Sequence, residues 1–308
     1  MKPRAFITGV GGFVGPYLVR HLVGSGFGVF GCDRKGSAVD GCAVEKCDVT
    51  DAAAVAAVVK KARPDFVFHL AGQSSVSKSW KEPELTWKVN VDGFRNVLNA
   101  VAAANIKPGI LLVSSAEVYG IPRIFPTPET HEIVPVSPYG KSKVEQEKLA
   151  AEFLRSGKGS VVIARSFNHT GPGQPSEFVC SNFARQVADI ESGKQKPVLT
   201  VGDLGVRRDF CDVRDVVKAY LLLLEKGRAG EAYNVCSGST FAIGDVIAKL
   251  AKISGAKFRV EQESSRVMDN AVPVLHGDHS KLTAATGWQP SISLDQTLAD
   301  LLDYWRAR

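Results

Sequence analysis

The sequence lacks the cysteine patterns of disulfide-bonded or metal-binding proteins. Its six cysteines stand at positions 32, 42, 47, 180, 211 and 236, with no Cys-x-x-Cys pair and no close histidine. We therefore expect free thiols and no metal site. His276 and His279 could begin a zinc site, but no further ligand cluster accompanies them, so we interpret residues 276–279 as a turn before a helix.

Long apolar runs and clusters of like charge are also missing. The N-terminus runs directly into a strand pattern rather than a signal peptide, and apolar runs such as Ala52–Val59 are far shorter than a membrane span. The net charge of +6 is spread without a basic run, which favours neither a nucleic-acid surface nor a membrane partner. With 44% hydrophobic and 23% charged residues, the chain is typical of a globular protein, and elimination predicts the cytoplasm.

Short β-branched segments alternate with amphipathic helical segments through the first half of the chain. The predicted strands are Arg4–Thr8, Gly28–Cys32, Phe66–Leu70, Ile110–Ser114 and Ser160–Ala164. The predicted helices are Gly12–Ser25, Ala52–Ala62, Thr86–Ala104 and Tyr139–Ser156. This alternation predicts an α/β fold with a doubly wound parallel sheet, the Rossmann arrangement.

The pattern loosens beyond residue 165. Turn-forming residues 168–175 predict a loop that leaves the sheet, and a helix over about Val213–Glu225 with a strand over Glu231–Val235 predicts a return to it. We expect residues 1–165 and about 209–237 to form the dinucleotide-binding domain. Residues of about 166–208 and 238–308 should form a smaller, interwoven lobe that binds the substrate.

A glycine-rich turn follows the first predicted strand. Gly9, Gly12 and Gly15 give the spacing G-x-x-G-x-x-G, and Phe13 lies within the turn. The first glycine permits the tight turn, the second lets the backbone approach a pyrophosphate, and the third lets the helix pack closely on the sheet. With a strand before it and a helix after it, the pattern predicts a site for NAD or NADP.

Three further segments end predicted strands on the side where the cofactor should lie. Asp33 stands where a carboxylate would bind a ribose hydroxyl, which favours NAD, whereas Arg34 and Lys35 could hold the 2′-phosphate of NADP. The choice stays open, with a preference for NAD. The other two segments consist of Asp48 with Val49, and of Leu70, Ala71 and Gly72.

Tyr139 and Lys143 stand one helical turn apart at the start of a predicted helix, and Ser115 follows the end of a predicted strand. Because ligands of a doubly wound sheet bind beyond the carboxyl ends of its strands, these side chains should face one crevice. A carbonyl that receives a hydride from the cofactor also needs a proton. We expect Tyr139 to donate it, Lys143 to stabilise the phenolate and hold the nicotinamide ribose, and Ser115 to position the substrate oxygen.

Four longer motifs carry a resemblance to a known family. They are AGQSSV (71–76) with Ser79 and Trp80, FNHTGPGQ (167–174), RDFCDVRD (208–215) and NVCSG (234–238). With them the whole chain resembles the extended short-chain dehydrogenases/reductases that modify nucleotide sugars. It is most similar to the GDP-6-deoxy-D-lyxo-4-hexulose reductases, which are related to the GDP-mannose 4,6-dehydratases. The resemblance implies NAD(P)H-dependent reduction of the C4 ketone of GDP-4-keto-6-deoxy-D-mannose to GDP-D-rhamnose. It also implies a homodimer paired through the helices over 86–104 and 139–156.

The resemblance implies roles for substrate-binding residues as well. Gln73, Ser75 and Asn168 should contact the nucleotide sugar. Arg208 should bind its diphosphate, since an arginine can engage two phosphate oxygens at once. The alternative for Arg208 is a structural ion pair with Asp209 or Asp212.

One family motif is altered in this chain. The family commonly has R-x-R-P before a late E/D-V-P, and its second arginine binds the diphosphate. Met268 stands at that arginine's position and Asp269 follows it. Either Arg266 or Arg207 should replace the missing charge, or the nucleotide is held in another way.

Glu117 leaves the reaction itself open. In related 4,6-dehydratases a glutamate at this position removes the C5 proton of the sugar, a step that a reductase does not require. The alternatives are therefore a 4,6-dehydratase, which oxidises and reduces its cofactor within one turnover, and a 4-epimerase. A catalytically silent dinucleotide sensor is the alternative from another class, and the intact set of Ser115, Tyr139 and Lys143 argues against it.

Overall fold

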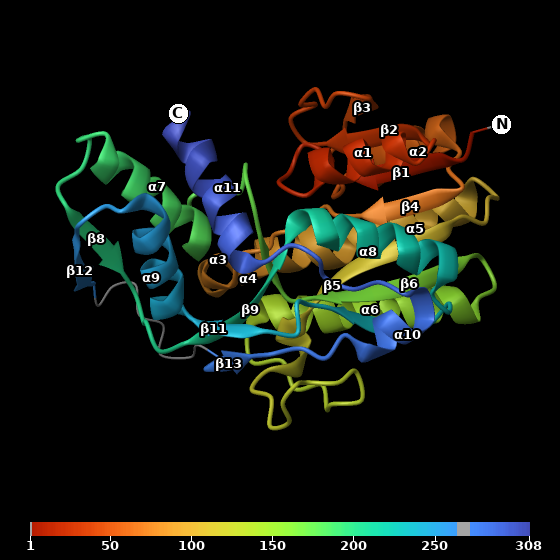
Figure 1. Cartoon of the computed structure of the whole chain (residues 1–308). Helices are drawn as coiled ribbons and strands as arrows, with labels where there is room; N and C mark the ends of the chain where they lie inside the picture. Colours follow the sequence, from red (N-terminus) through yellow and green to blue (C-terminus); the bar gives the residue numbers. More distant parts are fainter. Residues whose placement is uncertain (1, 264–271) are drawn as a thin grey trace.

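A parallel sheet forms the centre of the molecule in the computed structural model, which describes residues 2–263 and 272–308 (Figure 1). Its seven strands follow the order β10-β6-β5-β4-β1-β2-β3, and each adjacent pair is parallel. They are β1 (Arg4–Thr8), β2 (Gly28–Asp33), β3 (Cys42–Lys46), β4 (Phe66–His69), β5 (Gly109–Ser115), β6 (Ser160–Ser166) and β10 (Ala232–Val235). The predicted doubly wound α/β fold is confirmed.

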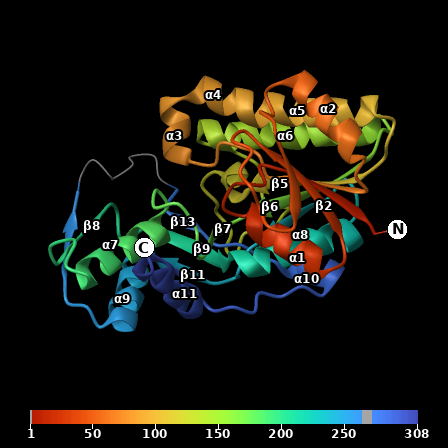
Figure 2. The ribbon, with the colours of Figure 1, turned by 90° about the horizontal axis from the view of Figure 1, so that it is seen from above.

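Helices cover both faces of this sheet (Figures 1 and 2). One face carries α1 (Gly15–Gly24), α8 (Val213–Lys226) and α10 (Ser280–Thr286), and the other carries α2 (Ala52–Ala62), α5 (Gly93–Ala103) and α6 (Pro138–Arg155). Side chains of a strand alternate between faces, so Ala5 and Ile7 enter one apolar core while Phe6 enters the other. A strand buried on both faces therefore needs the continuous apolar run that β1 has.

After β6 the chain leaves the sheet and builds a second, smaller region. Its four-stranded sheet consists of β7 (Asn168–Thr170), β9 (Arg207–Asp212), β11 (Thr240–Ala242) and β13 (Val274–Leu275), and a parallel pair consists of β8 (Val198–Val201) and β12 (Arg259–Gln262). With them pack α7 (Val179–Glu191), α9 (Ile243–Ser254) and α11 (Leu294–Arg306), which share a third apolar core. The chain returns to the large sheet to form α8 and β10 and then completes the smaller region.

The observed elements differ from the predicted ones in several places. The helix predicted from Gly12 begins at Gly15, because residues 10–14 form a turn. The helix predicted over 86–104 consists of α4 (Pro83–Trp87), a π-helical turn (Lys88–Asp92) and α5. Asn168–Thr170 is a strand rather than a loop, since it pairs with β9. The sequence analysis missed β3 and the short α3 (Val76–Lys81), neither of which has a clear apolar periodicity.

Candidate functional site

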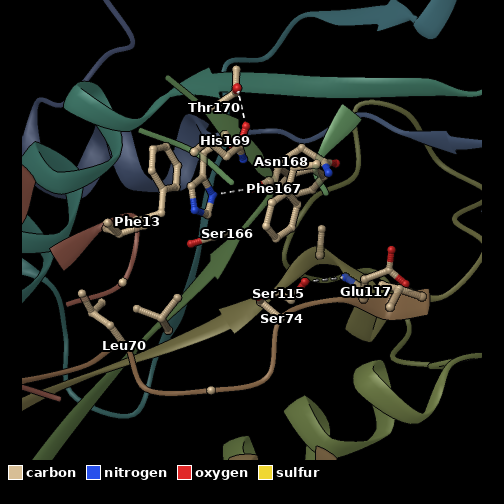
Figure 3. Close-up of a pocket in the computed structure, with 18 of the residues that line it drawn as sticks. Phe13, Leu70, Ser74, Ser115, Glu117, Ser166, Phe167, Asn168, His169 and Thr170 are labelled. Carbon is tan, nitrogen blue, oxygen red and sulfur yellow. Dashed lines mark hydrogen bonds between the residues drawn. The ribbon is translucent and has the colours of Figure 1, made fainter. Parts of the chain in front are cut away.

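The carboxyl ends of the central strands open onto a cleft of about 370 Å³ (Figure 3). The glycine turn after β1 forms one wall, and β7 with the start of α7 forms another. The predicted site residues that line this cleft are Gly9, Gly12, Phe13, Gly15, Leu70, Gly72, Gln73, Ser115, Glu117, Tyr139, Lys143 and Asn168. The structure thus brings together the glycine turn, the predicted catalytic group and part of the predicted substrate site.

Close packing explains the first and last glycines of the turn. Gly9 has a φ of +71°, and a Cβ there would lie 2.8 Å from the backbone of Ala71. A Cβ on Gly15 would lie 1.9 Å from the carbonyl oxygen of Val10. At Gly12 the nearest atom to such a Cβ is the carbonyl oxygen of Gly9 at 3.2 Å, a milder contact, and the residue itself is exposed and lines the cleft. Such an exposed backbone beside the start of α1 suits a pyrophosphate.

Asp33 lies at the end of β2, against the glycine turn. A Cβ on Gly11 would come within 1.7 Å of its Oδ2 atom. Its Oδ1 atom accepts hydrogen bonds from the backbone N–H groups of Gly36 and of Ser37, the latter at 3.1 Å. The backbone therefore holds this carboxylate at the end of β2, while Arg34 beside it is exposed.

Several other predicted residues lie around the cleft rather than in its wall. Asp48 accepts hydrogen bonds from the N–H and hydroxyl of Thr50, both at 2.9 Å, and Val49 is buried beside it. The Ser75 hydroxyl caps α3 by accepting from Lys78 N–H at 3.2 Å. Ala71, whose N–H donates to Thr8, also stands outside the lining. Arg266 and Met268 lie outside the described residues.

The start of α6 places Tyr139 and Lys143 on one face. Ser137 caps the helix by accepting from Gly140 N–H at 3.0 Å, and Pro138 occupies its first turn. The Lys143 ammonium group donates to the Val113 carbonyl at 2.9 Å and lies 5.7 Å from the centroid of the Tyr139 ring. Both side chains are buried at the bottom of the cleft.

Burial changes the pKa of both groups. It raises the pKa of Tyr139 to about 12, although a hydrogen bond with Ser115 acts in the opposite direction. It lowers the pKa of Lys143 to about 8, which the Glu147 carboxylate opposes. At neutral pH Tyr139 therefore carries its proton and Lys143 is mainly cationic, the states required to donate a proton and to stabilise the resulting phenolate.

A π-helical turn connects this part of α6 to the end of β4. The Asn90 carbonyl accepts from Gln146 Nε2 at 2.7 Å, and its side-chain Nδ2 donates to the Ser142 hydroxyl at 2.9 Å. The same side chain accepts from the Gln73 N–H at 2.7 Å and donates to the Gln73 carbonyl at 3.1 Å. Asn90 thereby fixes the position of Gln73 relative to α6, the helix that carries Tyr139 and Lys143.

Glu117 lines the cleft, whereas Arg208 lies outside its lining but close enough for its charge to act on Glu117. Burial raises the pKa of Glu117, and the charge of Arg208 opposes that rise. Arg208 donates to the carbonyls of Arg207 and Val272 at 2.9 and 2.8 Å. The alternative ion-pair partners bind other groups: Asp209 accepts from Ser237 and Gly238, and Asp212 binds Arg214.

The sequence analysis missed His169 as a residue of the cleft wall. Its ring is parallel to that of Phe13, with centroids 6.2 Å apart and planes inclined by 7° (Figure 3). Its Nδ1 bonds to the Phe167 carbonyl at 3.1 Å, and because a carbonyl only accepts, Nδ1 carries the proton. Burial lowers the pKa of His169, so the ring is neutral and Nε2 is an acceptor. Its position inside the FNHTGPGQ motif was the available signal.

Two further results concern the described part of the chain. Residues 2–263 and 272–308 contain no group of three or more His, Cys, Asp or Glu side chains that could hold a metal ion. Within the same residues, no helix combines the length and apolar character needed to cross a membrane.

The fold and the site together define an oxidoreductase of the short-chain dehydrogenase/reductase type, built to bind a dinucleotide. Residues 6–301 match the GDP-mannose 4,6 dehydratase family, and the chain belongs to that family. Its similarity to individual members covers almost the full length. A GDP-6-deoxy-D-mannose reductase of Pseudomonas aeruginosa is 35% identical over 310 residues, covering 100% of this chain and 99% of the relative.

Solved structures agree with this assignment. The structure of RMD from Pseudomonas aeruginosa complexed with NADPH matches with a TM-score of 0.87 at 34% identity, over 99% of both chains. A UDP-glucose 4-epimerase from Thermotoga maritima, solved with UDP-glucose, matches with a TM-score of 0.91 at 28% identity over 98% of both chains. The similarity therefore extends to nucleotide-sugar enzymes that catalyse different reactions.

Proposed function

We propose that the protein is a GDP-4-keto-6-deoxy-D-mannose reductase that uses NADH or NADPH and forms GDP-D-rhamnose. The observation that carries this proposal is the cleft itself, where a dinucleotide-binding glycine turn faces Ser115, Tyr139 and Lys143. The full-length similarity to a GDP-6-deoxy-D-mannose reductase supports the substrate. The cofactor supplies the hydride that attacks C4 of the sugar.

The chain's own groups account for the rest of the reaction. Ser115 donates a hydrogen bond to the C4 oxygen and positions it, and Tyr139 gives the proton that the new alkoxide requires. Lys143 stabilises the phenolate that remains and binds the nicotinamide ribose. Water then returns the proton to Tyr139.

The cofactor and the sugar nucleotide occupy different parts of the cleft. Backbone N–H groups of the glycine turn would hold the pyrophosphate, and Asp33, Asp48 and the segment Leu70 to Gly72 would contribute to the rest of the dinucleotide site. Gln73, Glu117 and Asn168 contact the sugar, and Arg208 with Arg207 or Arg266 binds the diphosphate. Ser75 supports this site indirectly through its hydrogen bonds to Gln73.

The division of the chain belongs to the same proposal. Residues 1–165 and about 209–237 bind the dinucleotide, whereas about 166–208 and 238–308 bind the nucleotide sugar. The cytoplasm is the proposed location, and the six free cysteines suit a reducing compartment. The proposed homodimer pairs α5 and α6, which lie side by side along one face of the molecule (Figure 2).

A 4,6-dehydratase is the second candidate, because Glu117 lines the cleft beside the predicted proton donor. The two reactions differ in cofactor balance. A reductase consumes NAD(P)H in proportion to product, whereas a dehydratase returns its cofactor to the starting state. Absorbance at the nicotinamide band, followed with GDP-4-keto-6-deoxy-D-mannose and separately with GDP-mannose, distinguishes them.

Glu117→Gln tests the same distinction within the site. It retains the shape and hydrogen-bonding capacity of the side chain but removes the base. We expect 4-keto reduction to fall by no more than about tenfold, equivalent to about 1.4 kcal/mol of transition-state stabilisation. If the native enzyme instead eliminates water from GDP-mannose and incorporates solvent deuterium at C5, and both abilities vanish in the variant, the reductase assignment is wrong.

A further inference from the structure

A buried ion pair lies directly behind the predicted catalytic group. Glu147 follows Lys143 by one turn of α6, and Arg165 lies on β6. Arg165 binds Glu147 through two bonds, Nε to Oε1 at 3.0 Å and Nη2 to Oε2 at 2.8 Å. The Ser114 hydroxyl donates to Oε1 at 2.6 Å, one residue before Ser115. The two charged side chains are only 7% and 10% exposed, so water screens them little.

The remaining donor atoms of Arg165 also have partners. Nη1 donates to the Tyr119 hydroxyl at 3.1 Å and to the Glu129 carbonyl at 3.2 Å. The Tyr119 hydroxyl in turn donates to Asn234 Oδ1 at 2.7 Å. Burial acts to lower the pKa of Arg165, but its bonds to Glu147 raise it above the ordinary value. These hydrogen bonds hold the buried pair in one geometry.

Lys143 needs such a partner because its surroundings otherwise disfavour its charge. His69 on β4 is fully buried, and burial lowers its pKa to about 3, so it is neutral. Tyr139, one turn earlier on α6, carries its proton at neutral pH. From β5 the Val113 carbonyl accepts one hydrogen bond from the ammonium group. Glu117 acts on Tyr139, whereas Glu147 is the carboxylate that acts on Lys143.

We propose that Glu147 and Arg165 are positioning residues of the reaction: the Glu147 carboxylate keeps the ammonium group of Lys143 charged, and Arg165 holds that carboxylate in place. The inference rests on the proposed function. It adds that the charge on Lys143 depends on a carboxylate that contacts neither cofactor nor substrate.

The sign of the effect follows from the charges. A lysine whose pKa is lowered loses its charge as pH rises, and turnover falls with it on the alkaline side. Removing the Glu147 charge lowers that pKa further, so the alkaline limb of activity moves to lower pH. In Glu147→Gln the Arg165 cation remains and repels Lys143 as well. In a variant that removes both charges, the shift should have the same direction and be smaller.

The experiment compares pH profiles of kcat for the native protein, Glu147→Gln and the double variant Glu147→Gln/Arg165→Met. We expect the alkaline limb of Glu147→Gln to shift downward by on the order of one pH unit. The double variant should shift by less, and activity at low pH should recover in both. Glu152→Gln, at an exposed position on the same helix, is the matched control and should leave the profile unchanged.

Two results would overturn the proposal: an alkaline limb that does not move in the folded variants, or a loss of kcat by the same factor at every pH, as a purely structural role predicts. If Glu147→Gln does not fold, the double variant alone decides in the same way. If the native protein reduces no GDP-linked keto sugar, acylation of Lys143 by acetic anhydride can be followed across pH by mass spectrometry. The pH midpoint of acylation should be highest in the native protein, lower in the double variant and lowest in Glu147→Gln. This measurement separates failure of this inference from failure of the proposed function.

Discussion

At the scale of single residues, the predicted proton donor Tyr139 and the lysine beside it, Lys143, share one buried environment that changes their pKa values in opposite directions. Burial raises the pKa of Tyr139 to about 12 and lowers that of Lys143 to about 8, so the two values move apart. A proton donor works best when its pKa lies near the operating pH, whereas its cationic partner has to stay charged there. Burial therefore acts against both requirements, and it is opposed at Tyr139 by the hydrogen bond with Ser115 and at Lys143 by the charge of Glu147.

Tyr139→Phe tests the donor without disturbing the packing. We expect NAD(P)H binding, measured by fluorescence titration, to stay close to that of the native protein, because only a hydroxyl is removed. Turnover should fall by roughly 10²- to 10⁴-fold, the usual contribution of a general acid. A variant with nearly native turnover would contradict the assignment of Tyr139.

Asp33 is the residue that should set the choice of cofactor. Its carboxylate is held by backbone N–H groups against the glycine turn, where it can accept from a ribose hydroxyl but would repel a 2′-phosphate. We expect NADH to bind more tightly than NADPH, and Asp33→Ala to improve NADPH binding relative to NADH by about tenfold or more. Arg34→Ala is the matched comparison and should change the ratio in the opposite direction. Tighter binding of NADPH by the native protein would show that Arg34 and Lys35 decide instead.

At the scale of elements, the turn between β1 and α1 separates a structural glycine from a functional one. A methyl group at Gly15 would collide with a carbonyl, so Gly15→Ala should cost about 1–3 kcal/mol of stability in thermal unfolding. At Gly12 the methyl group would lie 3.2 Å from the Gly9 carbonyl oxygen, a tight contact but a far milder one than at Gly15, so Gly12→Ala should lose less stability than Gly15→Ala. The methyl group at Gly12 lies where a pyrophosphate would approach, so cofactor affinity should drop by about tenfold or more. Equal cofactor affinity in Gly12→Ala and the native protein would place the pyrophosphate elsewhere.

Other elements show what could and could not be predicted from the sequence. The helix over Ala52–Ala62 was predicted to the residue, because a capping aspartate and clear apolar periodicity mark it. The interruption by the π-helical turn could not be predicted, since it depends on Asn90 meeting Gln73 and α6 in space. His169 and the Glu147–Arg165 pair were missed for a similar reason. The roles of these residues depend on contacts with side chains that are distant in sequence.

At the scale of the whole molecule, the proposed dimer can be measured directly. α5 and α6 lie along one face, and beside them α3 and α4 expose Trp80, Leu85 and Trp87 at 44%, 40% and 43%. Large apolar side chains gathered in one region are typical of an interface between subunits. Light scattering should give twice the chain mass at micromolar concentration. A monomer mass under the conditions of full activity would refute the dimer.

The path of the chain also has a consequence for how the protein is made. β10 occupies the edge of the large sheet beside β6, yet more than sixty residues, which comprise the first part of the smaller region and α8, separate them in sequence. During synthesis on the ribosome, the flank of β6 and the sheet face that α8 covers must stay uncovered until residue 235 has emerged. A product that stops after β6 would carry that open flank permanently and tend to associate with other chains. Neither region should therefore be obtainable as a separate, well-behaved fragment by a single cut.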